Sequence, residues 1–328
     1  MDDRRRRSVP LASYHHRMTP LLAIGLFVVG VVIVVVATER LLEGIVDVAA
    51  ALRIAPFVAS VILSGLEAEN IAVGLAAGQR GQSEIALGTV FGGATFLLCI
   101  ALGVGALIAP LHARLPRGVV LLVPAAAILA GLPIAFGETP RWTGVVLLAA
   151  FGFALAYLVR ASRGHRFTAD DEERGAEGGR SLGRAALVTA GGIVVIAIGG
   201  ELVAVGAEGL ISTVGLSAGL VGMVITPVAI EAEEIIRQVI PARRGYGDVS
   251  AGNAVGTVLY FTLCNLGLIV LLTPVAVPDA VRILDWPFLV LAAIMAAVFL
   301  LRGHVGRVGG AILAGLGMLY GALHIVRF

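Results

Sequence analysis

The chain has 328 residues, of which 58% are hydrophobic and only 14% are charged, with a formal net charge of +2. Soluble domains carry about 25% charged residues, so this composition excludes an ordinary soluble protein and indicates a polytopic membrane protein. Apolar runs long enough to cross a hydrocarbon core of about 30 Å recur along the whole sequence. They are predicted to be helices, because the backbone of each span must be satisfied internally, and they do not alternate as the strands of an outer-membrane barrel would.

Hydropathy predicts about ten spans, which lie near residues 21–38, 55–78, 84–109, 118–137, 142–160, 185–205, 215–240, 248–273, 286–301 and 308–325. A polar tail at residues 1–17 precedes them. A Gly-rich, charged linker at 161–184 divides the chain into a first five-helix unit, 18–160, and a second, 185–328. The predicted fold class is therefore all-α, with five spans on each side of an exposed linker.

The distribution of arginine predicts how the chain is oriented in the cell membrane. Six arginines lie in or beside the linker, at positions 160, 163, 166, 174, 180 and 184. Because positive charge in short loops marks the cytoplasmic side, the linker is predicted to be cytoplasmic. The four arginines at positions 4–7 favour the opposite orientation.

Two acidic phrases interrupt the apolar runs, LEAENI at 66–71 and IEAEEI at 230–235. A shift of 164 residues places Glu67 on Glu231 and superimposes the phrases without a gap. Ten positions between residues 66 and 103 are identical to their counterparts in this register. The two segments are therefore copies of one repeat.

The copies are separated by an odd number of predicted spans, so they enter the membrane from opposite sides. Such an inverted-topology repeat is a common architecture of secondary transporters, and it brings the centres of both copies together near the bilayer midplane. A carboxylate at that depth costs several kcal/mol unless it has a partner or a water-filled cavity. The sequence has no lysine, and Arg237 is the exception to the near absence of arginine from the spans. The partner is therefore predicted to be a cation from outside, and carboxylate oxygens suit Ca2+.

The second half of each copy reads EIALGTVFGG at 84–93 and DVSAGNAVGT at 248–257, after SGLEAENIAV and PVAIEAEEII. These phrases resemble the cation/Ca2+ exchanger superfamily, whose sodium/calcium exchangers carry two inverted repeats with a G-[TS]-[S]-x-P-E phrase followed by D-I-A-x-G-N-x-x-G-[ST]. The resemblance covers both repeats directly and implies a secondary antiporter fold and activity.

The resemblance leaves two registers open for the site glutamates. Counted from the second phrase, the family's Glu falls on Asn70 and Glu234, while its Ser falls on Glu67 and Glu231. Counted from the glycine of the first phrase, the Glu falls on the remaining pair of acidic residues, Glu69 and Glu233.

The resemblance also implies ligand positions in the second phrase, and here the sequence departs from the family. The family's Ser or Thr is Gly93 in the first copy and Thr257 in the second. The oxygen-bearing residue one turn later is Leu97 or Phe261. Several oxygens that would bind sodium are therefore replaced by apolar groups, which puts sodium coupling in question.

Helix geometry divides the candidates into two faces. Glu67 and Asn70 share a face, as do Glu231 and Glu234. Positions two apart lie roughly 200° round an ideal helix, so Glu69 and Glu233 join the same site only if the helix is broken. Gly65 and Pro227 make such a break reasonable. The full set of predicted cation ligands is Glu67, Glu69, Asn70, Glu231, Glu233, Glu234, Asn253 and Thr257.

The function predicted from these residues is export of Ca2+ or a related divalent cation in exchange for Na+ or H+. A passive cation channel with an acidic ring is the alternative, and protonated carboxyls that tie helices together are the structural alternative for the glutamates. No nucleotide-binding loop or nucleophile–base pair is evident, so neither an enzyme, a resident cofactor nor a nucleic-acid partner is expected. Glu84 and Asp248 are expected to cap helices, and Glu39 and Glu43 to lie at the end of the first span.

Overall fold

The structure is a computed structural model that describes residues 19–52, 56–64, 68–79, 81, 83–163, 182–214 and 232–327. Seven helices in this part of the chain are long and apolar enough to cross a membrane: 20–52, 86–108, 117–135, 141–161, 182–202, 247–272 and 281–301. The predicted all-α polytopic fold is confirmed. Large apolar side chains such as Leu21, Phe153 and Leu187 stand exposed, because in a membrane protein lipid rather than other helices covers them.

The first half contains α1 (Pro20–Leu52), α2 (Pro56–Ser64), α3 (Ala68–Gln79), α4 (Ser83–Phe96), η1 (Leu97–Ala101), α5 (Leu102–Ile108), β1 (Leu111–His112), α6 (Arg117–Leu129), η2 (Pro133–Ala135) and α7 (Arg141–Arg163). The second half contains α9 (Leu182–Val214), α12 (Ala232–Arg243), α13 (Gly247–Leu259), η4 (Tyr260–Asn265), α14 (Leu266–Leu272), η5 (Val281–Asp285), α15 (Trp286–Leu301), β2 (His304–Val305) and α16 (Arg307–Arg327).

The register of the repeat reappears in the helix boundaries. A shift of 164 residues carries both ends of α3 onto those of α12, and both ends of α5 onto those of α14. The turns that follow α3 and α12 contain Gly81 and Gly245, whose φ angles are 70° and 81°, a region in which a side chain would be strained. The π-helical turns η1 and η4 interrupt the next helix at matching places. The two segments that share a sequence pattern therefore have the same succession of helices and turns.

Two short backbone pairings show the opposite orientation of the halves. β1 pairs antiparallel with β2, joining Leu111 to Val305. Glu138 makes an isolated antiparallel bridge to Ala276. β1 precedes α6 and β2 follows α15, while Glu138 follows α6 and Ala276 precedes α15. Because α15 is the counterpart of α6 in the repeat, each pairing joins the connection before this helix in one half to the connection after it in the other. Because α6 and η2 lie between β1 and Glu138, the two pairings stand at opposite ends of the helices, as a pseudo-twofold axis in the membrane plane requires.

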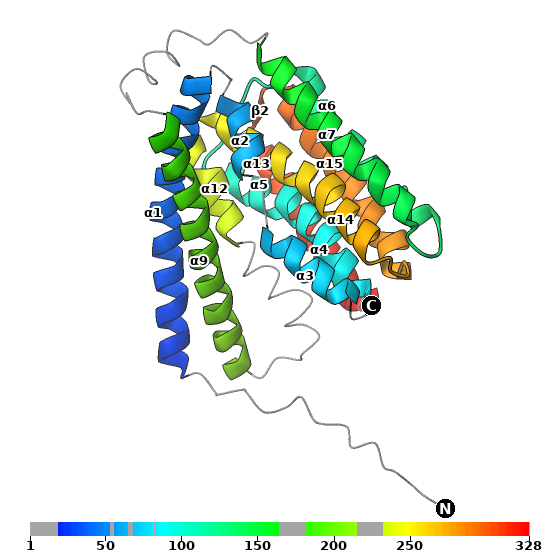
Figure 1. The fold of residues 1–328 in the computed structure, drawn as a ribbon. Coiled ribbons are helices and arrows are strands. Elements are labelled where there is room, and N and C mark those ends of the chain that lie inside the picture. Colours follow the sequence, from blue (N-terminus) through cyan, green and yellow to red (C-terminus); the bar gives the residue numbers. More distant parts are fainter. Residues whose placement is uncertain are drawn as a thin grey trace, which may run out of the picture.

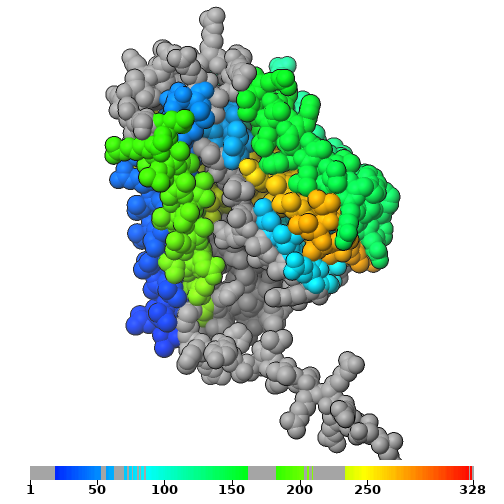
Figure 2. All heavy atoms as spheres, viewed as in Figure 1, coloured from blue at the N-terminus to red at the C-terminus, as the bar shows by residue number. Residues whose placement is uncertain are grey.

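α1 and α9 form a pair that lies along one side of the other helices (Figure 1). In the space-filling view they make one edge of the face, and α6 and α7 make the opposite edge (Figure 2). Each helix of the pair has 33 residues, or about 50 Å at 1.5 Å per residue, which is longer than the predicted spans 21–38 and 185–205.

The helix that contains the first predicted span extends beyond Glu39 and Glu43, because α1 continues to Leu52, and the position of these residues at the end of the span stays a prediction. Their charges are accommodated by ion pairs rather than by ending the helix. Glu43 pairs with Arg40 at 3.1 Å, and Glu39 pairs with Arg244 beyond the end of α12 at 2.7 Å. An apolar run thus ends at the first charges, whereas the helix that contains it does not have to end there.

α13 lies at the centre of the molecule, and every one of its residues except Asp248 is buried. It packs against α2, α6 and α12. Ser60 of α2 donates a hydrogen bond to the carbonyl of Val249 at 2.8 Å. Gly252 and Gly256 face the backbone of α2, where an added Cβ would lie 2.6 Å from a carbonyl oxygen. Small residues thus allow α2 and α13 to approach closely, while α12 packs against another side of α13.

Candidate functional site

Glu233 and Glu234 lie in the first turn of α12, and their exposed fractions are 8% and 1%. Acidic side chains are favourable in the first turn, because the helix dipole places partial positive charge there. That interaction is weak beside the cost of burying two carboxylates, so the pair needs further neutralisation.

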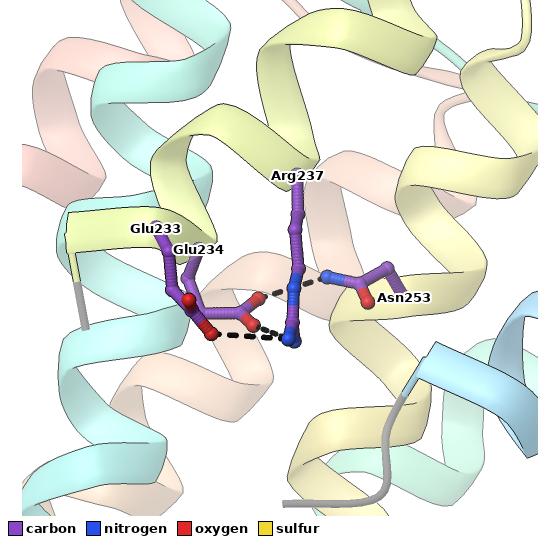
Figure 3. A network of polar contacts seen from close by, with 4 residues as sticks. All are labelled: Glu233, Glu234, Arg237 and Asn253. Carbon is purple, nitrogen blue, oxygen red and sulfur yellow. Dashed lines mark hydrogen bonds and ion pairs between the residues drawn. The ribbon is translucent and has the colours of Figure 1, made fainter. Parts of the chain in front are cut away.

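Arg237 supplies part of that neutralisation from the next turn of the same helix. Its Nη2 lies 3.0 Å from Glu233 Oε1, and its Nη1 donates to Glu234 Oε1. The guanidinium therefore contacts both carboxylates at once (Figure 3). Arg237 is itself buried, with 7% of its surface exposed. The buried network consists of two negative groups and one positive group, and it arises from the i, i+3 and i, i+4 spacing of three neighbouring residues.

α13 completes the network from the other side. Asn253 Nδ2 donates to Glu234 Oε2 at 2.9 Å (Figure 3). Thr257 lies one turn further along α13 on the same face; it is fully buried, and its hydroxyl has no hydrogen-bond partner among the described residues. The structure thus brings together three of the predicted ligands, Glu233, Glu234 and Asn253, and it places Thr257 on the same buried helix face as Asn253.

A small cavity of about 20 Å³ adjoins the network, lined by Thr38, Leu41, Leu42, Ile45, Ser60, Arg237, Pro241, Val249 and Asn253. This volume holds about one water molecule. Thr38 Oγ1 and Asn253 Oδ1 are buried there without a hydrogen-bond partner in the described part of the chain. Sequence analysis did not identify Thr38 or Ser60 as site residues. Each is a single hydroxyl in an apolar run, and such residues are too common to be distinguished without the fold.

The helices of the site are held together by a second polar contact. Ser250 Oγ on α13 donates to Gln238 Oε1 on α12 at 2.7 Å. Both side chains are buried. This bond keeps α12 and α13 in register one turn beyond the glutamates, so it positions the site without belonging to it.

The first repeat contributes less to the described site. Asn70 lies in α3 and is half-buried. Glu69 is also in α3, but its side chain lies outside the described part of the structure, as do Glu67 and Glu231 altogether. The expected convergence of Glu67 with Glu231 therefore stays a prediction. Among the described residues, no group of three or more His, Cys, Asp or Glu side chains is placed to hold a metal ion.

Apolar packing replaces the oxygens that the resemblance implied in the second phrase. Phe261 and Leu97 are both fully buried. The ring of Phe261 lies against Gly93, where an added Cβ would be 2.9 Å from a ring carbon. An aromatic ring in contact with a glycine backbone leaves no polar ligand at these positions, so among the described residues the polar groups of the site come from α12 and α13.

Glu84 and Asp248 occupy the first turns of α4 and α13, where the helix dipole favours them, but the N-cap of α13 is Tyr246, without a side-chain cap hydrogen bond. Glu84 is exposed. Asp248 Oδ1 accepts a hydrogen bond from the backbone N–H of Arg114 at 2.7 Å, which ties the start of α13 to the connection between the strand and α6. Both carboxylates lie at the starts of helices and outside the network around Arg237.

Residues 22–160 and 184–326 match the family model described as sodium/calcium exchanger protein. The inner membrane protein YrbG of Escherichia coli (strain K12) is 26% identical over 316 residues, which is 92% of this chain and 97% of that protein. The putative antiporter CaxA of Alkalimonas amylolytica is 25% identical over 309 residues, covering 89% of this chain and 95% of its own.

The fold is also similar to that of a solved exchanger. A structure of the sodium-calcium exchanger NCX_Mj, soaked with 10 mM Na+ and zero Ca2+, superimposes with a TM-score of 0.77, at 19% identity, and covers 93% of this chain and 99% of its own. At that identity the likeness shows the fold alone. The resemblance read from the repeat phrases is confirmed, and with it the inverted-repeat membrane architecture.

Proposed function

Because this chain belongs to the sodium/calcium exchanger protein family and is a transporter of the cation exchanger type, we propose that it exports Ca2+, or a related divalent cation, in exchange for Na+ or H+. The cation binds at the glutamates near the bilayer midplane, and the site is exposed to the two sides in turn. The name of the relative CaxA, a putative antiporter, supports exchange.

The observation that carries the proposal is the buried contact between Glu234 and Asn253. It joins a carboxylate on α12 to an amide on α13. Both helices belong to the second copy of the repeat, in which they are the counterparts of α3 and α4. Carboxylate, amide and hydroxyl oxygens are the ligands that hard divalent cations prefer. Glu67, Glu69, Asn70, Glu231 and Glu233 are proposed to complete the site, with Thr257 as the hydroxyl ligand.

The direct test is uptake of radiolabelled Ca2+ into proteoliposomes under an imposed Na+ gradient and, separately, under an imposed pH gradient. Uptake driven by one of these gradients and absent from protein-free vesicles is the expected result, and the effective gradient identifies the counter-ion. Flux that proceeds equally without any counter-ion on the opposite side would favour a channel over an exchanger. Failure of both gradients to drive any cation would contradict the proposal.

Replacement of Thr257 by valine is expected to reduce transport about tenfold, equivalent to about 1.4 kcal/mol, without lowering thermal stability. The hydroxyl is buried without a partner among the described residues, so its removal relieves an unfavourable burial while it deletes a proposed ligand. The matched control is Thr262→Val, because the hydroxyl of Thr262 already donates to the carbonyl of Val258 at 2.6 Å. If Thr257→Val and Thr262→Val transport at the same rate, Thr257 is not a cation ligand.

The linker 161–184 is proposed to be cytoplasmic. A Ser162→Cys variant tests this, because Ser162 lies at the end of α7, where the linker begins. An impermeant thiol reagent is expected to leave this cysteine unlabelled in intact cells and to label it after permeabilisation. The unmodified protein is the control, since Cys99 is buried and Cys264 partly buried. Labelling in intact cells would show that the topology is reversed.

A further inference from the structure

Arg237 lies where a bound cation would be expected, against both glutamates of the site. We propose that Arg237 is a tethered counter-cation: its guanidinium holds Glu233 and Glu234 until an incoming cation displaces it, and in this way it sets the affinity of the site. The inference rests on the proposed function, since it concerns the same cation site.

The charges favour competition between the guanidinium and the cation. Arginine stays protonated in proteins, so Arg237 always carries a positive charge. It donates to Glu234 Oε1, while Asn253 donates to the other oxygen of the same carboxylate. Each carboxylate oxygen has two lone pairs, so a cation at Glu234 would either share the carboxylate with Arg237 or displace the guanidinium. Two positive charges within a few ångströms of each other repel in a buried site, which favours displacement.

The repeat itself links the arginine to the glutamate. In the register that superimposes the two copies, Glu234 corresponds to Asn70, and Arg237 corresponds to Val73. The second copy thus has both a carboxylate and a guanidinium at these positions, and the first copy has neither. Glu234 and Arg237 are therefore charged together in one copy and replaced together by neutral residues in the other, as expected of a pair that works as a unit, whereas Glu233 has an acidic counterpart, Glu69, in the first copy.

The cavity beside the network has room for about one water molecule only, but its lining offers the guanidinium other hydrogen-bond acceptors. Arg237 lines this cavity together with Thr38 and Asn253. The exposed fractions of those two residues are 2% and 3%, and Thr38 Oγ1 and Asn253 Oδ1 lack partners in the described part of the chain. Both oxygens can accept hydrogen bonds from guanidinium N–H groups. A small shift of Arg237 away from the glutamates would therefore exchange carboxylate partners for neutral acceptors and vacate the carboxylates.

The test is Ca2+ binding by purified Arg237→Gln protein, measured as the Ca2+ concentration that gives half-maximal thermal stabilisation. Removal of the competitor is expected to lower this concentration by about tenfold or more, because Ca2+ then binds the carboxylates without displacing a positive charge. In proteoliposomes the same variant should show a lower KM and also a lower maximal rate, since tighter binding slows release. A merely structural role would lower the rate without lowering KM.

Two further variants make the result specific. Arg237→Lys keeps one charge but loses the fork that spans two carboxylates, so its Ca2+ affinity should lie between those of the unmodified protein and Arg237→Gln. If Arg237→Gln fails to fold, Arg237→Lys carries the test. Arg244→Gln is the matched control, because Arg244 pairs with Glu39 at a half-exposed position, and its removal should leave the affinity unchanged.

The outcomes separate the inference from the proposed function. Binding by the unmodified protein that is no weaker than binding by Arg237→Gln and Arg237→Lys would overturn the tethered counter-cation and leave the exchanger standing. Absence of stabilisation by Ca2+, Sr2+ and Na+ in all of these proteins would overturn both. Tighter binding by Arg237→Gln, with Arg244→Gln unchanged, would support the inference.

Discussion

Replacement of Glu234 by glutamine is expected to abolish cation exchange, with a fall in the initial rate of Ca2+ uptake of about 100-fold or more, equivalent to about 2.7 kcal/mol. The carboxylate is the most deeply buried acidic group of the described site, with 1% of its surface exposed. It is also the group on which the donors of α12 and α13 converge. A glutamine has nearly the same shape, but it is neutral, and its amide N–H groups would meet the donors of Arg237 or Asn253.

The measurement is uptake into proteoliposomes that contain equal amounts of monodisperse protein, so that loss of folding is separated from loss of the site. Glu84→Gln is the control, because Glu84 is exposed in the first turn of α4 and lies outside the network. It should transport at nearly the unmodified rate. If Glu234→Gln takes up Ca2+ at the rate of the unmodified protein, this carboxylate is not a ligand. The second register of the repeat, in which Glu69 and Glu233 are the ligand pair, would then be favoured.

Replacement of Gly310 by valine is expected to destabilise the protein severely, by about 3 kcal/mol, the upper end for overpacking. At this position α16 crosses α5 backbone to backbone. A Cβ on Gly310 would lie 2.6 Å from the carbonyl oxygen of Gly103, and a Cβ on Gly103 would lie 2.7 Å from the amide nitrogen of Ala314. Backbone atoms have no rotamer by which to give way, so the two helices must separate.

The inverted repeat predicts the same effect at a second place. α7 crosses α14 at Gly144 and Gly267, where a Cβ on Gly144 would lie 2.7 Å from the carbonyl oxygen of Gly267. Gly267 is the counterpart of Gly103 in the repeat. Gly144→Val should therefore lower the thermal midpoint as much as Gly310→Val does.

Each of these substitutions has a control on its own helix. Nothing lies within 4 Å of a Cβ placed on Gly315 of α16 or on Gly152 of α7, so alanine at those positions should leave the thermal midpoint in detergent unchanged. A Gly310→Val protein as stable as Gly315→Ala would show that α5 and α16 do not pack as closely as described.

The amino-acid sequence by itself determined the membrane class, the inverted repeat and its register. These properties depend on signals that are local or periodic along the chain. Apolar runs of a given length become spanning helices in lipid whatever surrounds them. The shift of 164 residues that superimposes LEAENI on IEAEEI also superimposes α3 on α12. Both helices are followed by a turn in which a glycine, Gly81 or Gly245, has a positive φ angle.

Only the tertiary structure decided what surrounds the glutamates. The sequence singled out Arg237 as an exception, but the close approach of α1, α2 and α13 buries its guanidinium against Glu233 and Glu234 and places Thr38 beside it. In the same way the ring of Phe261 meets Gly93, which lies 168 positions earlier in the chain. The ion pair of Arg244 with Glu39 likewise joins residues that are distant in sequence. The pairs of Arg237 with its two glutamates follow from their spacing on one helix, but the burial of this network depends on α1, α2 and α13. The cost of a buried charge and the fit of an apolar contact both depend on such distant neighbours, which only folding brings together.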